Sequence, residues 1–165
     1  MLLNRIKRVP QKSLRGGTAA VELALVMPLI VTVLLGVLEM GRTVQVMQVL
    51  DNAAREGARQ ASTSTASLAQ IKTNVQSYIQ NAEPSITDFT GYDLQYANIT
   101  SPTVTDPTAA NQLDRFTMTV VLPFDNIRWT WTGQFMKSGT SLQATVNWYS
   151  LRDLPVQITN SLPGD

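Results

Sequence analysis

The sequence predicts an α+β protein, in which a long N-terminal helix lies half in a membrane and packs on a short helix and a three-stranded antiparallel sheet. An uninterrupted apolar segment near the N-terminus continues into residues with helical spacing. In the second half of the chain, apolar and polar residues alternate with a period of two, which is typical of half-buried strands. The 165 residues are enough for one such domain.

The apolar segment runs from Leu23 to Leu38 and is interrupted only by Pro28, Thr32 and Gly36. At 1.5 Å per residue it spans about 24 Å, and extension back to Thr18 brings it close to the ~30 Å of a bilayer core. We therefore predict that residues 18–41 form the transmembrane half of the helix. That half includes Glu22, and a carboxylate in a membrane costs a few kcal/mol and usually has a function.

Basic residues are concentrated ahead of this segment. Residues 1–17 carry no acid, whereas the rest of the chain holds eight basic and twelve acidic side chains. The positive-inside rule places residues 1–17 in the cytoplasm as a basic leader and residues 42–165 outside as an α+β head. A basic leader on an acidic body also argues against binding to nucleic acid. The leader's five basic residues are Arg5, Lys7, Arg8, Lys12 and Arg15.

Three other interpretations of the apolar segment were weighed. A secretory signal peptide disagrees with the residues after Leu38, which contain no A-x-A-like cleavage site. A buried helix of a soluble protein disagrees with the one-sided basic flank. A plain single-pass anchor agrees with both observations, so this alternative stays open.

Helical spacing continues beyond the membrane segment to about Ser62. The small residues Ala54, Gly57 and Ala58 are predicted to pack closely against another helix or a sheet. Arg55 and Arg59 form a like-charged pair four residues apart, so we expect them to face solvent or a partner. The predicted buried face consists of Val44, Met47, Leu50, Ala54, Ala58 and Ala61.

The remaining elements follow from periodicity. The polar run 62–65 ends the first helix and offers N-caps for a second helix, which ends near Ala82. Its apolar stripe is Leu68, Ile71, Val75 and Tyr78. The three strands are indicated by Tyr92, Leu94, Tyr96 and Ile99, by Phe116, Met118, Val120 and Leu122, and by Leu142, Ala144, Val146 and Trp148. Core or loop packing is expected for Trp129, Trp131 and Phe135.

No pattern in the sequence indicates catalysis. The absence of His and Cys excludes thiolate chemistry, Cys/His zinc sites and histidine acid–base catalysis. Asp106, Asn111 and Asp114 were weighed as calcium ligands, but their spacing does not match an EF-hand and such loops are usually only solvated. Asn98 begins a glycosylation sequon of the kind that arises by chance. We predict a structural protein that is not an enzyme and has no cofactor or metal.

The junction between leader and helix is the most informative motif. It reads GGTAAVEL from Gly16 to Leu23, so a glycine is followed five residues later by an acid. It resembles a type IV prepilin junction, where a membrane aspartyl peptidase cuts after the glycine. The wider run, RGGTAAVELALVMPLIVTVLLGVLEMGR with the later DNAAREGARQAS, resembles the TadE-like family. Members of that family are minor pilins, or pseudopilins, of the bacterial tight-adherence (Flp pilus) secretion system.

The resemblance implies a pilin-like fold and a place for each residue of the junction. A prepilin peptidase would cut between Gly17 and Thr18, and Glu22 would pair with the new amine of Thr18 on an adjacent subunit. Leu23, Pro28 and Leu38 would lie in the bacterial inner membrane. The implied partners are other pilin or pseudopilin subunits, the pilus assembly platform and the peptidase. The alternative is a single-pass, membrane-anchored extracytoplasmic binding protein that is not processed as a pilin.

Overall fold

The structure, a computed structural model, describes residues 15–127 and 139–152, and it is α+β as predicted. Helix α1 spans Arg15–Ser62 and helix α2 spans Leu68–Ala82. The described chain divides between Leu38 and Glu39 into two compact units. The first unit contains the beginning of α1, and the second contains the rest of α1 together with every other element of the described chain. The predicted aromatics Trp129, Trp131 and Phe135 and most of the basic leader lie outside the described residues.

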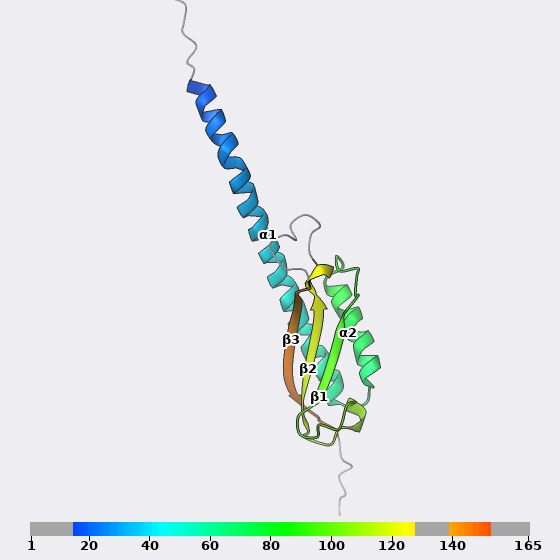
Figure 1. Ribbon diagram of the computed structural model, residues 1–165. Helices are drawn as coiled ribbons and strands as arrows, with labels where there is room; N and C mark the ends of the chain where they lie inside the picture. The colour runs from blue at the N-terminus through cyan, green and yellow to red at the C-terminus, as the bar shows by residue number, and fades with distance from the viewer. Residues whose placement is uncertain (1–14, 128–138, 153–165) are drawn as a thin grey trace, which may run out of the picture. The chain divides into compact units, whose positions relative to one another are not determined.

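The second unit is built on a three-stranded antiparallel sheet in the order β1-β2-β3 (Figure 1). The strands span Asp93–Asn98, Arg115–Pro123 and Ser141–Tyr149. Two short 3-10 helices lie in the connections, η1 at Pro107–Ala109 and η2 at Phe124–Asn126. The predicted three strands are thus confirmed, and strands that follow one another in the chain lie side by side in the sheet.

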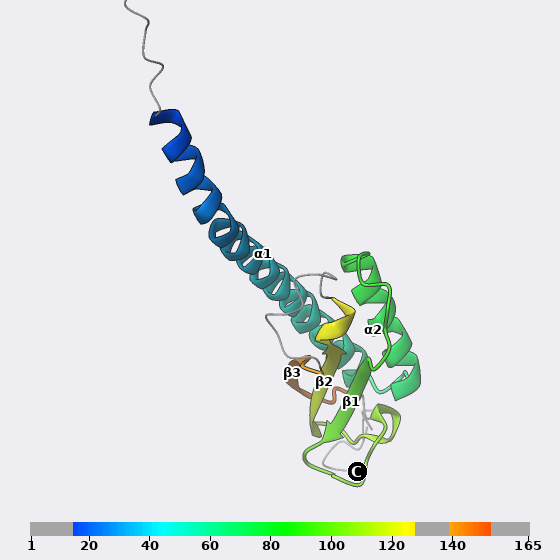
Figure 2. The same cartoon turned by 45° about the horizontal axis from the view of Figure 1, so that its top comes forward.

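One face of this sheet carries the core. On the central strand β2, the alternate residues Phe116, Met118, Val120 and Leu122 are fully buried. The ring of Phe116 packs against Tyr96 of β1, with 5.1 Å between the ring centroids. Helix α2 and the second part of α1 lie beside this sheet (Figures 1 and 2). Strand alternation therefore separates a helix-covered face from an open face.

Helix α1 contributes small side chains to this core, in a stripe shifted slightly from the predicted face. Val44, predicted to be buried, is 55% exposed, and Val46 is buried instead. The spacing 44–47–50 uses two steps of three, and each step of three slips about 60° around a helix. Val44 therefore lies about 120° from Leu50. The buried α1 residues are Val46, Leu50, Ala53, Ala54, Ala58 and Ala61.

Helix α2 begins at a capping box on Ser67, two residues after the end of the polar run 62–65. The Ser67 side chain accepts from the Gln70 backbone N–H, and the Gln70 side chain accepts from the Ser67 N–H. The prediction that the run 62–65 supplies the N-cap is wrong. The buried stripe of α2 also ends at Ile79 rather than at Tyr78, which is 38% exposed.

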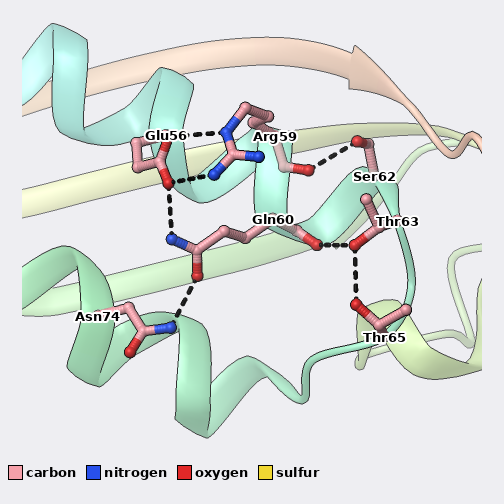
Figure 3. A network of polar contacts seen from close by, with 7 residues as sticks. All are labelled: Glu56, Arg59, Gln60, Ser62, Thr63, Thr65 and Asn74. Atoms are coloured by element: carbon pink, nitrogen blue, oxygen red, sulfur yellow. Dashed lines mark hydrogen bonds and ion pairs between the residues drawn. The ribbon is translucent and has the colours of Figure 1, made fainter.

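A polar network joins the outer faces of the two helices (Figure 3). The Arg59 guanidinium forms an ion pair with Glu56 at 2.7 Å, and this hydrogen-bonded contact lowers the pKa of Glu56. Gln60 donates to Glu56 and accepts from Asn74 of α2. Arg59 therefore pairs within its own helix, while Arg55 is exposed as predicted.

Candidate membrane and assembly segment

Between Leu23 and Leu38, the first unit exposes an almost entirely apolar surface. By length and composition, α1 is long and apolar enough to cross a membrane. Its large apolar side chains from Val21 to Leu38 are 41–75% exposed, Leu23 and Leu38 included, except for the half-buried Leu35. Such a surface is far larger than the apolar patches that soluble monomers expose. It is consistent with membrane anchoring through this helix.

Pro28 lies inside α1, and the helix continues through it. Proline has no N–H, so the carbonyl of Ala24 lacks the donor that normally comes from four residues later. One turn further on, the Thr32 hydroxyl donates to the Pro28 carbonyl at 2.8 Å. Thr32 carries the only polar side chain between Glu22 and Glu39, and this bond pairs its hydroxyl within the helix. A paired hydroxyl suits a helix that is surrounded by hydrocarbon.

The junction residues occupy the first turns of the same helix. A Cβ atom built on Gly17 would meet nothing within 4 Å, so the backbone there is open to approach. Thr18 and Glu22 are both exposed and lie one turn apart on the same side of the helix. Within the described residues, the Glu22 carboxylate forms no ion pair or hydrogen bond.

The predicted packing residues are found in the core of the second unit. Ala54 and Ala58 are fully buried. A Cβ atom built on Gly57 would lie 3.2 Å from Cγ2 of Val75 and 3.5 Å from Cγ of Met118. These three small residues therefore let α1 approach both α2 and the sheet within the same chain.

Arg42 holds three segments of the second unit together, a role that its position after an apolar run did not reveal. Its Nε donates to the Ile127 carbonyl and its Nη2 to the Ser85 hydroxyl, both at 2.8 Å. Ser85 in turn donates to the Glu83 carboxylate, which also accepts from Gln45 of α1. The guanidinium thus links α1 to the segment after α2 and to the end of η2.

Glu39 is the other charged residue that sequence reasoning missed. It is only 8% exposed, and neither of its carboxylate oxygens has a hydrogen-bond partner among the described residues. Its backbone carbonyl, by contrast, accepts from Thr43 at 2.9 Å. A buried carboxylate without a partner is costly, so we expect Glu39 to lower the stability of the second unit.

The loop residues considered as calcium ligands act as structural acceptors instead. Asp106 accepts from the backbone N–H groups of Leu68 and Thr108 and from the Thr108 hydroxyl, and the bond from that hydroxyl holds the pKa of Asp106 below its usual value. Asp114 accepts from the Asn111 N–H and from the buried Asn98 side chain, and these bonds likewise lower its pKa. Within residues 15–127 and 139–152, no three acidic side chains gather in a way that could hold a metal.

The burial of Asn98 also bears on its sequon. Its side-chain amide donates to Asp114 and its oxygen accepts from the Ser101 N–H. With only 4% of the residue exposed, the amide is inaccessible for glycosylation in the folded protein.

Comparison with known proteins identifies the segment that carries these features. Residues 17–59 match a family model described as TadE-like protein. This match agrees with the predicted resemblance and covers about a quarter of the chain. No curated protein and no solved structure matches the chain. The TadE-like segment suggests a protein associated with the tight-adherence pilus and includes Gly17, Thr18, Glu22 and the whole apolar run.

Proposed function

We propose that this protein is a membrane-anchored TadE-like minor pilin, or pseudopilin, that takes part in assembling an adhesive tight-adherence pilus. The observation that carries the proposal is the coincidence of a TadE-like segment with an exposed apolar helix bearing one unpaired acid, Glu22. In this proposal the protein is a structural subunit and not an enzyme. It resides in the bacterial inner membrane with residues 1–17 in the cytoplasm and residues 42–165 outside.

The exposed part of α1 lies in two environments in turn, first in lipid and then among the helices of neighbouring subunits. Before assembly, the apolar side chains between Val21 and Leu38 lie against lipid. During assembly, the same side chains pack against the helices of neighbouring subunits, and the lipid contacts are exchanged for protein contacts of similar polarity. The apolar surface therefore needs no rearrangement to move from membrane to pilus.

Glu22 makes this exchange of lipid contacts for subunit contacts depend on one particular pairing between subunits. Its carboxylate is costly in hydrocarbon and gains most from a cation that another subunit supplies. Cleavage after Gly17 by a prepilin peptidase creates such a cation, the α-amine of Thr18. The open backbone around Gly17 supports access by the peptidase. An uncleaved chain would place the peptide bond and the leader where the amine is required.

The test measures the intact mass of the membrane-extracted protein together with pilus yield. The proposal expects a wild-type chain that begins at Thr18, whereas Gly17→Val retains the leader and fails to support pili. Glu22→Gln keeps the size of the side chain and removes its charge, so it is expected to insert and be processed but to reduce pilus yield. Asp51→Asn, which removes an exposed charge of the second unit on the same helix, serves as the matched control.

The outcomes separate this proposal from the alternative. A wild-type chain that keeps Met1–Gly17 while pili form normally would favour a single-pass, extracytoplasmic binding protein that is not processed. A Glu22→Gln protein that is processed and fully active would leave the pilin assignment standing but reject the pairing of Glu22 with the Thr18 amine.

A further inference from the structure

A pocket lies within the second unit, between the turn that follows α1 and the chain that leaves β3. Its lining residues are Thr63, Ser64, Thr65, Leu151 and Arg152. Its volume of about 390 Å³ is within the range of pockets that hold small molecules. The two walls are far apart in the sequence, but Leu151 donates its backbone N–H to the Ser62 carbonyl at 2.8 Å. The hydroxyls of Ser64 and Ser150 lie 3.3 Å apart and join the walls a second time.

The end of α1 beside this pocket presents no unpaired carbonyl. A helix leaves its last four carbonyls without donors from its own backbone ladder. Here all four accept hydrogen bonds, from the hydroxyls of Ser62 and Thr63 and from the backbone N–H groups of Ser64 and Leu151. An anion in the pocket would therefore not meet the bare negative end of the helix.

Arg152 brings a positive charge to the pocket. Its Nη1 donates to the carbonyls of Ala110 and Thr108, at 3.2 Å and 3.4 Å, and these bonds anchor one nitrogen of the guanidinium. Arg152 forms no ion pair with any residue that the structure describes. Asp106, in the same loop, instead accepts from Leu68 and Thr108. Nε and Nη2 of Arg152 consequently keep their N–H donors, and such an edge matches the two oxygens of a carboxylate.

The charge of the pocket favours a carboxylate over a phosphate. Among the described lining residues, Arg152 is the only charged one, so it supplies a single positive charge. A carboxylate carries one negative charge and is matched by it. A phosphate monoester carries nearly two at neutral pH and would keep part of its charge unpaired.

The threonine hydroxyls in the pocket are acceptors. The Thr63 hydroxyl donates its hydrogen to the Gln60 carbonyl at 2.9 Å and lies 3.0 Å from the Thr65 hydroxyl (Figure 3). A hydroxyl has only one hydrogen, so Thr65 must be the donor in the second contact. Both oxygens therefore offer lone pairs, which suit a ligand that brings O–H groups. Leu151, which is 59% exposed, adds an apolar surface.

We propose that this pocket binds an acidic sugar, a hexose ring that carries one carboxylate. The carboxylate accepts hydrogen bonds from Arg152, ring hydroxyls donate to Thr63 and Thr65, and the apolar face of the ring lies on Leu151. This binding site goes beyond the proposed function, which concerns the first part of α1, and it does not depend on that function.

Nuclear magnetic resonance of the full-length protein in detergent tests the inference, with D-glucuronate as the ligand at constant ionic strength. We expect saturable shifts of the amide signals of Thr65, Leu151 and Arg152, with the buried amide of Val120 unchanged. Glucose has the hydroxyls without the carboxylate, and acetate has the carboxylate without the ring. Each should bind about tenfold more weakly or worse, because each lacks one set of hydrogen bonds. Glucose 6-phosphate should also bind more weakly than glucuronate.

Two matched pairs of variants locate the binding. Arg152→Gln should weaken glucuronate binding about tenfold or more, whereas Arg55→Gln removes an exposed charge on α1 and should not. Thr65→Val keeps the shape of the side chain and removes its oxygen, so it should weaken binding severalfold. Thr73→Val makes the same change at an exposed position of α2 and should leave binding unchanged.

Four results would overturn the inference. The first is the absence of saturable shifts at the pocket amides in the wild-type protein. The second is glucose, acetate or glucose 6-phosphate binding as tightly as glucuronate. The third is unchanged affinity in Arg152→Gln. The fourth is an equal loss of affinity in Arg152→Gln and Arg55→Gln, which would show attraction to the overall charge of the protein rather than binding in this pocket.

Discussion

Gly57 of α1 faces Val75 of α2 so closely that a Cβ atom on the glycine would lie 3.2 Å from Cγ2 of the valine. At that distance the neighbouring side chain must move before any larger residue fits. The next residue along α1, Ala58, is also fully buried. Packing of α1 in the core therefore depends on side-chain size at two consecutive positions, which makes the packing testable.

Ala58→Leu is expected to destabilise the second unit by about 1–3 kcal/mol, because the larger side chain overpacks a filled core. Unfolding of the full-length protein in detergent, followed by tryptophan fluorescence, measures the change. Ala69→Leu places the same side chain on the exposed side of α2 and should leave the stability nearly unchanged. Equal stability of the two variants would mean that α1 is not close-packed at Ala58.

Glu39→Met is expected to stabilise the second unit by about 1–3 kcal/mol. The substitution removes a buried carboxylate that lacks a partner among the described residues and keeps a side chain of similar length. Gln48→Met, at an exposed position of the same helix, is the control. The same unfolding measurement applies, and a loss of stability in Glu39→Met would show that the carboxylate makes a favourable contact.

Asp114→Asn is expected to lower stability at pH 7 by about 1–2 kcal/mol, because it weakens charge-assisted hydrogen bonds from Asn111 and Asn98. The pKa of Asp114 is lowered in the folded protein, so its stabilising effect is complete above the unfolded pKa of about 3.9. It is lost as the pH falls through the folded pKa.

The difference in the free energy of unfolding between wild type and Asp114→Asn should consequently shrink below about pH 4, as the pH falls toward the lowered pKa of Asp114. Unfolding measured at several pH values provides the comparison, and Asp51→Asn at an exposed position of α1 is the control. A difference that stays constant down to pH 2 would mean that the ionised carboxylate of Asp114 does not stabilise the fold.

The orientation of the chain gives a fourth prediction. From the five basic residues ahead of the apolar run, we predict that the N-terminus lies in the cytoplasm and the C-terminus outside. A reporter that is active only outside the cytoplasm should therefore work when fused after Asp165. Activity of a reporter that works only in the cytoplasm, fused at the same position, would show that the orientation is opposite to the predicted one.

Periodicity predicted the elements well, because each has a long enough pattern to define its type. Periodicity placed individual side chains less well, since a shift of one residue along a helix decides whether a side chain faces the core or the solvent. Val46 replaces Val44 on α1, and Ile79 replaces Tyr78 on α2. Both errors came from counting steps of three where the packing follows steps closer to four.

Contacts between residues that are far apart in the chain could not be predicted from the sequence. Asp106 and Asp114 were recognised as neighbouring acids, but their acceptor roles depend on Leu68 and Asn98, which are distant in the chain. The Arg42 contacts to Ser85 and Ile127 are equally non-local. The junction residues could be predicted from the sequence because their signal is local, a glycine and an acid at a fixed spacing beside an apolar run, and their roles stay a prediction.

The order of elements along the chain determines when the second unit can fold. Its core combines Val46 and Leu50, near the start of the chain, with Leu142 and Ala144 near the end. During synthesis, the α1 contribution emerges long before β3 is available to close the sheet. Contacts between such distant segments slow folding and leave apolar surface exposed in the meantime. A chaperone that shields nascent chains would therefore be most useful between the synthesis of α1 and that of β3.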